Sequence, residues 1–536
     1  MSSKDVTQRQ VTSSAFTDEY INNNYGFIWV GGQAIYWNYA VGSDVVAESV
    51  RRLADLMSPA ERTNAVTYSR ALTRVINQHV LLGRWDGNYG DGIEPTRWVG
   101  SEDILRLWLQ SGGQKVRYGQ CWVFAALLTT LLRASDIPAR TVTNYESHHD
   151  RGLTSDGTSV LRQFDNIVQR DEDQWNFHVW SEAWLERPDL VQPADWNAVD
   201  ATPQEPSPLA PGQPYRSGPA YVPFIRSNVQ LANYDTLFIL AEVNARGVCP
   251  ITGQPLQIGT FVVTKKPGME PSLYVFNNPE IITGNYKIPT TKRDSESASP
   301  SFPPTYTGCE REGGMRINSV PPNPRVGEDF VITVTEGNVS VEDIVIRMEL
   351  RSYMGESLGF IRNFTGTRRV DVTESDYRPY VDESSVFRFS VGVYNESGAF
   401  ILHDALRITL EYDMVQVDAM NVANTIAMTL TYTNPLSVPM TGVVVNVAGP
   451  DYSYASMAQP DIPANGRFTS TVTVQCGNNT DSNVMIPVSL DSNETLSAYG
   501  SGWSSCSERS SNGGIVMLSE ISLLQVMLLS LLTLCM

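Results

Sequence analysis

The stretch Tyr118-Gly119-Gln120-Cys121-Trp122-Val123-Phe124-Ala125 is the part of the sequence from which the fold can be predicted. An apolar run continues from it to Leu132 and stops before Pro138, a residue that ends helices. We therefore expect a buried helix with Cys121 in its first turn. Backbone N–H groups at a helix N-terminus favour a thiolate. A lone cysteine in an apolar helix is, however, more often a small core residue.

Two later stretches favour a chemical role for this cysteine. Residues 175–180 alternate like a strand and include His178, and residues 196–204 form a second short strand that ends at Asp200. A cysteine nucleophile needs a base, and the base needs a carboxylate to hold its tautomer. A helix cysteine with a histidine and an aspartate on neighbouring strands is the papain-like arrangement. The alternative is a packed core histidine and a turn aspartate.

Five segments of the sequence resemble the animal transglutaminase family. They are YGQCWVFA, WNFHVWSEAW, WNAVDATPQE, GRWDGNYGDGIEPTRWVGS and RTVTNYESHHD. The first three are similar to the catalytic motifs of that family. The resemblance implies that Cys121, His178 and Asp200 are catalytic. It also implies that Trp85 donates its indole N–H to the transition state and that Trp175 forms the second wall of a substrate tunnel. Both tryptophans would also serve as packing residues.

The resemblance implies an α+β fold, with a papain-like transglutaminase core followed by two all-β, immunoglobulin-like sandwich or barrel domains. Alternating residues in the C-terminal half agree with this and predict strands at 316–320, 329–335, 343–353, 386–394, 406–412, 426–434, 442–449, 467–475 and 483–490. The predicted units are a disordered N-terminus (1–14), the catalytic core (15–292), a linker (293–312), two β-domains (313–411 and 412–503), and a small-residue spacer with a hydrophobic tail (504–536). The N-terminal β-sandwich of the family is expected to be missing, because the residues before Cys121 already resemble the core.

Calcium is the cofactor that the resemblance implies, with Asn244, Asp150 and Glu172 as the candidate ligands. The first calcium loop of the family corresponds to residues 75–80, which contain no carboxylate. A calcium ion takes six to eight oxygen ligands. We therefore expect incomplete ligand sets and only weak activation by calcium.

Composition limits the partners of this chain. The net charge of −19 argues against nucleic acid and is compatible with basic protein substrates. The resemblance implies proteins that contain glutamine and lysine, and polyamines, as partners.

The six cysteines are sparse and unclustered. Cys476 and Cys506 could pair in an oxidising compartment, which the sequence leaves open. Five N-x-S/T sequons, a number that a Ser/Thr-rich chain produces by chance, lie at Asn338, Asn363, Asn395, Asn478 and Asn493.

The C-terminal tail predicts membrane association. Residues 515–536 are largely apolar, but the best stretch is shorter than the roughly 20 residues that a spanning helix needs. Small residues at 510–514 suit a GPI cleavage site. The prediction is an anchor of this type if the protein enters the secretory route. A docking helix or an aberrant terminal exon is the alternative, in a protein that is otherwise cytoplasmic.

The function that the resemblance implies is that of a protein-glutamine γ-glutamyltransferase. Acyl transfer through a cysteine thioester would join a protein glutamine to the amine of a lysine or a polyamine and so cross-link proteins. Two alternatives stay open: a catalytically weak, membrane-associated scaffold of the same family, and a thiol deamidase or hydrolase.

Overall fold

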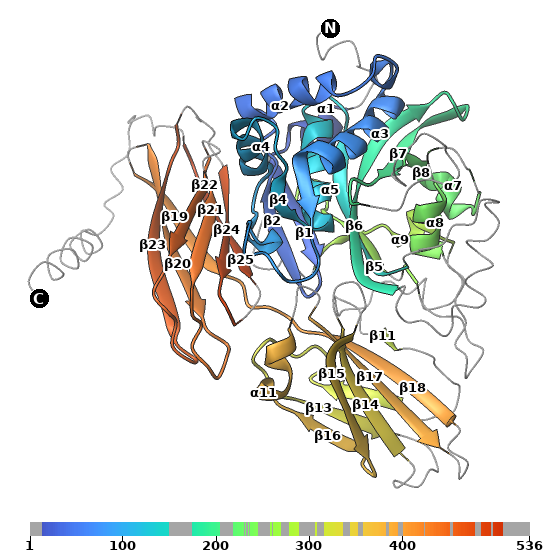
Figure 1. Cartoon of the computed structure of the whole chain (residues 1–536), viewed down its shortest axis with the longest axis vertical. Helices are drawn as coiled ribbons and strands as arrows, with labels where there is room; N and C mark the ends of the chain where they lie inside the picture. Colours follow the sequence, from blue (N-terminus) through green and yellow to red (C-terminus); the bar gives the residue numbers. More distant parts are fainter. Residues whose placement is uncertain are drawn as a thin grey trace, which may run out of the picture.

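The computed structural model describes residues 13–148, 174–203 and most of 218–506; the longer gaps in the last range are 245–257, 270–277, 289–305, 308–315 and 336–343. Figure 1 shows a mixed unit of helices and strands beside two units that consist almost entirely of strands. The predicted α+β class is therefore confirmed. The predicted boundaries between the units stay predictions.

The mixed unit is built around one buried helix, α5 (Cys121–Arg133), whose thirteen residues are all buried. The helical segments that contact it include α2 (Asp44–Asp55), α3 (Ala65–Val75), η4 (Ile76–Val80) and α4 (Ser101–Gln110). Three others contact the strands of the main sheet: α7 (Val222–Arg226), α8 (Leu237–Asn244) and α9 (Thr283–Tyr286). A short helix, α1 (Ser14–Thr17), begins the described part of the chain. The start of α2 is fixed by Ser43, whose hydroxyl accepts from the N–H groups of Val45 and Val46.

The main sheet of this unit lies against α5 and has the order β10-β9-β5-β6-β7-β8. Its strands are β5 (Ala139–His148), β6 (Gln174–Arg187), β7 (Gln192–Val199), β8 (Ala220–Tyr221), β9 (Phe261–Thr264) and β10 (Glu280–Ile281). All adjacent pairs are antiparallel. A separate hairpin and a short parallel pair complete the unit; they are β1 (Tyr25–Val30) with β2 (Gln33–Asn38), and β3 (Leu81–Gly83) with β4 (Val116–Gly119).

The first β-unit contains two sheets, of order β11-β18-β17-β14-β15 and β12-β13-β16. Its described strands are β11 (Tyr306–Thr307), β12 (Arg316–Val320), β13 (Phe330–Thr335), β14 (Ile344–Arg351), β15 (Ser357–Thr365), β16 (Arg369–Val372), β17 (Val386–Tyr394) and β18 (Phe400–Thr409). A short helix, α11 (Glu374–Tyr377), and a 3₁₀ turn, η10 (Arg378–Tyr380), lie between β16 and β17. The buried residues of β13 alternate with more exposed ones, as in a sheet with one face on a core.

The second β-unit also contains two sheets, of order β19-β20-β23 and β22-β21-β24-β25. Its strands are β19 (Gln416–Val422), β20 (Thr425–Thr433), β21 (Val444–Ala448), β22 (Tyr454–Ala458), β23 (Arg467–Gln475), β24 (Val484–Asp491) and β25 (Ala498–Ser504). Within the first sheet, β20 shows a strict alternation of buried and more exposed residues.

The second β-unit packs against the mixed unit, beside β1 and β2 (Figure 1). Met485 and Tyr499 belong to the same hydrophobic cluster as the buried residues of the β1–β2 hairpin. The Tyr499 hydroxyl donates to the backbone oxygen of Thr96 over 2.6 Å. The first β-unit contacts the mixed unit through a buried ion pair between Arg407 and Glu146.

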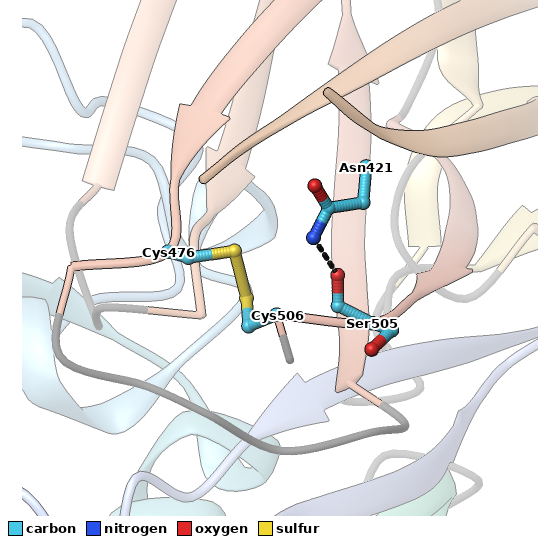
Figure 2. The surroundings of a disulfide bond; sticks show 4 residues. All are labelled: Asn421, Cys476, Ser505 and Cys506. Atoms are coloured by element: carbon cyan, nitrogen blue, oxygen red, sulfur yellow. Dashed lines mark hydrogen bonds between the residues drawn. A yellow bond between two sulfur atoms is a disulfide. The ribbon is translucent and has the colours of Figure 1, made fainter. Parts of the chain in front are cut away.

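Cys476 and Cys506 form a disulfide, which answers the pairing question that the sequence left open. Cys476 follows β23 and Cys506 follows β25, so the bond joins the two sheets of the second β-unit (Figure 2). Beside it, the Asn421 side chain donates to the backbone oxygen of Ser505, which attaches β19 to the same segment.

Several sequence predictions fall outside the described residues. These are Asp150, Glu172, nearly all of 1–14 and of the linker, and the tail at 507–536. Within the residues that the structure does describe, no helix has the length and apolar character that crossing a bilayer requires.

Candidate active site

Cys121 is the first residue of α5, as its predicted place in the first helical turn requires. The helix starts there because Gln120 is extended, with φ −124° and ψ −177°. The side chain of Cys121 is fully buried, and it forms no disulfide. Its backbone N–H lies at the positive end of the helix dipole, where a developing negative charge is favoured.

His178 and Asp200 meet at the same point. His178 lies on β6, and Asp200 is the residue after β7, the antiparallel neighbour of β6. The ring nitrogen Nε2 of His178 is 2.8 Å from Oδ2 of Asp200, and the imidazole is also hydrogen-bonded to the Cys121 side chain. Because the carboxylate accepts from Nε2–H, the other nitrogen, Nδ1, is the one that serves the thiol. The structure thus brings together the three side chains that the sequence singled out.

A second buried carboxylate, Glu242 on α8, lies near the same imidazole. Its Oε1 is 3.9 Å from Nε2 of His178. Burial disfavours the charged imidazole, but the charges of Glu242 and Asp200 outweigh that effect and hold the pKa of His178 well above its usual value. The surroundings therefore favour the imidazolium form, which pairs with a thiolate.

Sequence reasoning missed Glu242. Its place is fixed by Ser147, whose hydroxyl donates to Oε2 over 3.1 Å, and Asn144 in turn donates to the Ser147 hydroxyl over 2.9 Å. The available signal was one acidic residue within the apolar helix Leu237–Asn244. A buried charge usually has a partner, but the sequence does not show which side chain that partner is.

Trp85 carries an indole N–H with no obvious structural use. The residue is half-buried, yet its Nε1 is shielded from solvent and has no hydrogen-bond partner among the described residues. The ring lies over Gly83, where an added Cβ would come within 2.6 Å of it, so only glycine fits there. The second predicted tryptophan, Trp175, packs edge-on against the His178 ring with a centroid distance of 4.8 Å.

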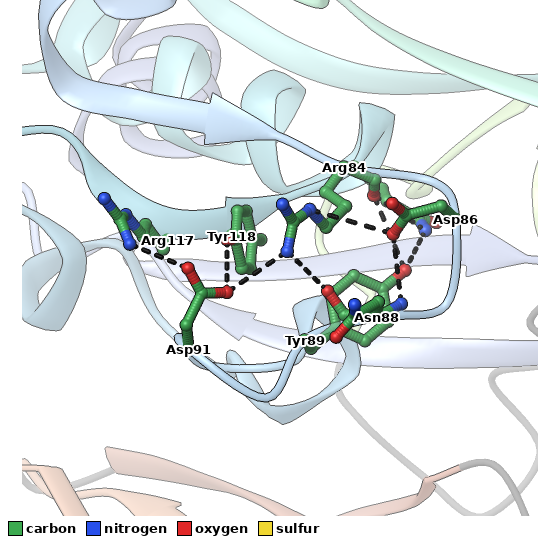
Figure 3. A network of polar contacts seen from close by, with 8 residues as sticks. Arg84, Asp86, Asn88, Tyr89, Asp91, Arg117 and Tyr118 are labelled. Atoms are coloured by element: carbon green, nitrogen blue, oxygen red, sulfur yellow. Dashed lines mark hydrogen bonds and ion pairs between the residues drawn. The ribbon is translucent and has the colours of Figure 1, made fainter.

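A polar network connects the loop of Trp85 to the strand that leads into Cys121 (Figure 3). The Asp91 carboxylate is at its centre and accepts from Arg84 over 3.1 Å, from Arg117 over 2.7 Å and from Tyr118 over 2.5 Å. The Arg84 guanidinium also stacks on the Tyr118 ring at 4.2 Å from its centroid. The residue before Trp85 and the segment before Cys121 are therefore held by one carboxylate.

Gln120 reinforces the same connection. Its side-chain amide donates to the hydroxyl of Tyr89 over 2.7 Å and to the backbone oxygen of Arg84 over 3.3 Å. On the backbone, the N–H of Arg84 donates to the oxygen of Gly119 over 3.2 Å. The two segments thus share side-chain and backbone bonds.

The described residues do not assemble a calcium site. The amide nitrogen of Asn244 donates to the backbone oxygens of Ile225 and Tyr286, and within the described residues no carboxylate cluster surrounds it. Residues 76–80 form a helical turn rather than a loop. Among the described residues, His178, Asp200 and Glu242 bring potential metal-ligand atoms close together: one such atom from each lies within 4.8 Å of the other two. One imidazole and two carboxylates do not provide the oxygen shell that calcium prefers.

A buried cysteine at a helix N-terminus, hydrogen-bonded to a histidine that an aspartate orients, defines a papain-like thiol site. The model of the transglutaminase-like superfamily matches residues 108–201, which include all three side chains. Mouse protein-glutamine γ-glutamyltransferase 2 is 33% identical over 393 residues, which cover 67% of this chain and 55% of the mouse protein. The same enzyme type from Cavia cutleri is 30% identical over 490 residues, which cover 80% of this chain and 68% of that protein.

The chain belongs to the transglutaminase family. The solved structure of red sea bream transglutaminase shares its fold, with a TM-score of 0.69 and 24% identity over 92% of this chain and 78% of that one. This chain spans about half the length of the mouse relative.

Proposed function

We propose that this chain is a protein-glutamine γ-glutamyltransferase that cross-links proteins. Its substrates are glutamine-containing proteins as acyl donors and lysine-containing proteins or polyamines as acceptors. The observation that supports this most is the line of contacts from Cys121 through His178 to Asp200. The names of the relatives from mouse and Cavia cutleri agree with it.

The first half-reaction forms a thioester. The Cys121 thiolate attacks the carbonyl carbon of a glutamine γ-carboxamide. The tetrahedral intermediate collapses as the C–N bond breaks, and His178 gives its proton to the leaving ammonia. Asp200 keeps the imidazole in the orientation in which it can exchange this proton.

The second half-reaction transfers the acyl group to an amine. The amine attacks the thioester carbonyl, His178 accepts a proton from it, and the Cys121 thiolate leaves. The product is an isopeptide or a substituted γ-amide. Water in place of the amine would give glutamate, and the apolar ring of Trp175 beside His178 helps to exclude water.

Both tetrahedral intermediates carry an oxyanion that needs hydrogen-bond donors. The backbone N–H of Cys121 at the start of α5 is one donor, and the indole N–H of Trp85 is the other. The buried, unused state of Trp85 Nε1 supports this role, because a buried donor without a partner is costly. The bound intermediate would supply the missing acceptor.

Incorporation of a labelled amine into casein tests the proposal. We expect incorporation with the wild-type chain and none with Cys121→Ala, a small-for-small change that preserves the fold. Release of ammonia without incorporation would indicate a deamidase, and no turnover in a folded protein would indicate a scaffold. Because residues 75–80, which correspond to the first calcium loop of the family, contain no carboxylate, we expect weak activation in a parallel series with added calcium.

A further inference from the structure

The second β-unit contains a disulfide that serves structure rather than catalysis. It connects the segment after β23 to the segment after β25, and so closes one end of the sandwich between its two sheets (Figure 2). Both sulfur-bearing residues are buried, with Cys476 0% and Cys506 4% exposed. Disulfides form and persist mainly in oxidising compartments such as the lumen of the endoplasmic reticulum and the extracellular space.

The catalytic-site thiol is compatible with such a compartment. Cys121 is 0% exposed, and among the described cysteines it forms no disulfide. The group beside Cys121 is the His178 imidazole, whereas Cys476 and Cys506 lie against each other. Cys121 can therefore stay reduced while Cys476 and Cys506 are oxidised in the same chain, because a disulfide needs a second cysteine within bonding distance.

Two sequons are an independent observation that also points to the secretory route. Asn363, within Asn363-Phe364-Thr365, is exposed on β15, the edge strand of its sheet. Asn493, within Asn493-Glu494-Thr495, is exposed in the turn after β24. An acceptor asparagine must lie at the surface of the folded product, because the attached glycan is bulky and hydrated.

The side chain of Asn493 has a contact that is compatible with modification. Its amide nitrogen donates to the Thr441 hydroxyl over 3.1 Å. A carboxamide nitrogen has two hydrogens, and N-glycosylation replaces one of them. The remaining N–H can therefore keep the bond to Thr441.

We propose that the two β-units mature in an oxidising secretory compartment, where Asn363 and Asn493 receive N-linked glycans and Cys476 and Cys506 are oxidised. In the oxidation, the two thiols lose two protons and two electrons, which reduce a protein disulfide of the oxidoreductase class to a dithiol. In the glycosylation, the asparagine nitrogen attacks the first sugar of a lipid-pyrophosphate-linked oligosaccharide. A C–N bond forms, the amide proton is lost, and the lipid pyrophosphate leaves. The proposal is independent of the acyl-transfer reaction.

The test is expression of the full chain in animal cells by two routes, one with an added secretion signal and one in the cytosol. Peptide mapping without reduction should find the 476–506 linkage in the secreted protein and free thiols in the cytosolic protein. Glycosidase treatment should increase the gel mobility of the secreted protein only. Asn363→Gln and Asn493→Gln should each remove one glycan, whereas Asn318→Gln, an exposed strand asparagine outside a sequon, should remove none.

Thermal unfolding gives a readout that does not depend on a mutation. The secreted chain should melt several degrees above the cytosolic chain, and reducing agent should lower its Tm toward the cytosolic value. Free thiols at positions 476 and 506 in folded secreted protein would overturn the disulfide part of the proposal. Unmodified Asn363 and Asn493 in the same protein would overturn the glycan part.

Discussion

The start of α5 and the second β-unit both bury cysteine sulfur, but they give it opposite chemistry. Cys121 faces the imidazole of His178, whereas Cys476 and Cys506 face each other. The exposed fractions of the three side chains are nearly equal, at 0%, 0% and 4%. Burial therefore does not decide whether a cysteine is reactive or structural; the neighbouring group does.

Buried carboxylates in the same two regions differ in a similar way. Asp200 contacts His178 at 2.8 Å and belongs to a set of ionisable partners. Asp491 in the second β-unit accepts hydrogen bonds from Ser489, Ser497 and Asn446, all of them neutral. Burial raises the pKa of Asp491 to about 6, against the opposing effect of Ser497, the distant charge of Arg97 and its other donors. Asp200 thus has an ionisable hydrogen-bond partner, whereas the side chains that donate to Asp491 are neutral.

If the imidazole of His178 makes Cys121 reactive, its removal should have the largest effect on activity. We expect His178→Ala to lower kcat/KM for amine incorporation by roughly a thousandfold, because the thiol loses both its base and its acid. Alkylation of Cys121 by iodoacetamide should still reach completion, since the thiol itself remains. A wild-type rate in this variant would show that Cys121 does not depend on its neighbour.

Replacement of the unused indole should have the next largest effect. Trp85→Phe keeps the ring packing but removes Nε1–H, and we expect kcat to fall about 100-fold, as for other lost oxyanion donors. Trp184→Phe, on β6 and packed against Trp196, is the matched control and should leave kcat unchanged. Equal rates in the two variants would exclude Trp85 as a donor.

Weakening of the network around Asp91 should have a smaller effect. Asp91→Asn removes the charge that joins Arg84 to Arg117, and we expect kcat to fall about tenfold. This effect is larger than that of losing an exposed ion pair and smaller than that of losing an oxyanion donor. Alkylation of Cys121 should proceed at the wild-type rate, because that reaction needs no oxyanion donor. Asp371→Asn, which removes the exposed pair with Arg369, serves as the control. If Asp91→Asn leaves kcat unchanged, the network does not position Trp85.

The pH dependence of stability should show the smallest effect, in the structural region. The pKa of Asp491 is higher in the folded state than in the unfolded state, so its contribution is full below about pH 4 and is lost as the pH rises through about 6. The shift corresponds to at most about 3 kcal/mol of unfolding free energy. Urea unfolding between pH 4 and 7 should therefore be less pH-dependent in Asp491→Asn than in the wild type. Parallel profiles would contradict this.

Several strands of the two β-units were predictable, but a strand rich in glycine and serine was not. Predicted residues 316–320, 386–394 and 467–475 coincide with β12, β17 and β23. In contrast, β25 (Ala498–Ser504) was missed because its glycines and serines are typical of turns. Its glycines permit close packing: a Cβ at Gly500 would come within 2.1 Å of the Val415 backbone oxygen.

The three motif residues of the candidate site were predictable because each lies in a long, distinctive segment. Glu242 was not predictable, and the Cys476–Cys506 pair could be named only as a possibility, because the partners come from distant parts of the chain. Glu242 reaches His178 only after α8 packs on β5, and Cys476 reaches Cys506 only after two sheets stack. Local periodicity contains no information on such long-range contacts.

The hydrophobic cluster shared by the β1–β2 hairpin and the second β-unit makes these two regions one cooperative unit. Separation of the β-unit would expose Met485 and Tyr499 together with the aromatic hairpin side chains that they cover. Each large side chain that becomes exposed costs roughly 1.5–3 kcal/mol. Strands β24 and β25 thus contribute to the stability of the catalytic unit, whose own sequence lies hundreds of residues earlier. A truncation designed to isolate that unit would remove part of its core.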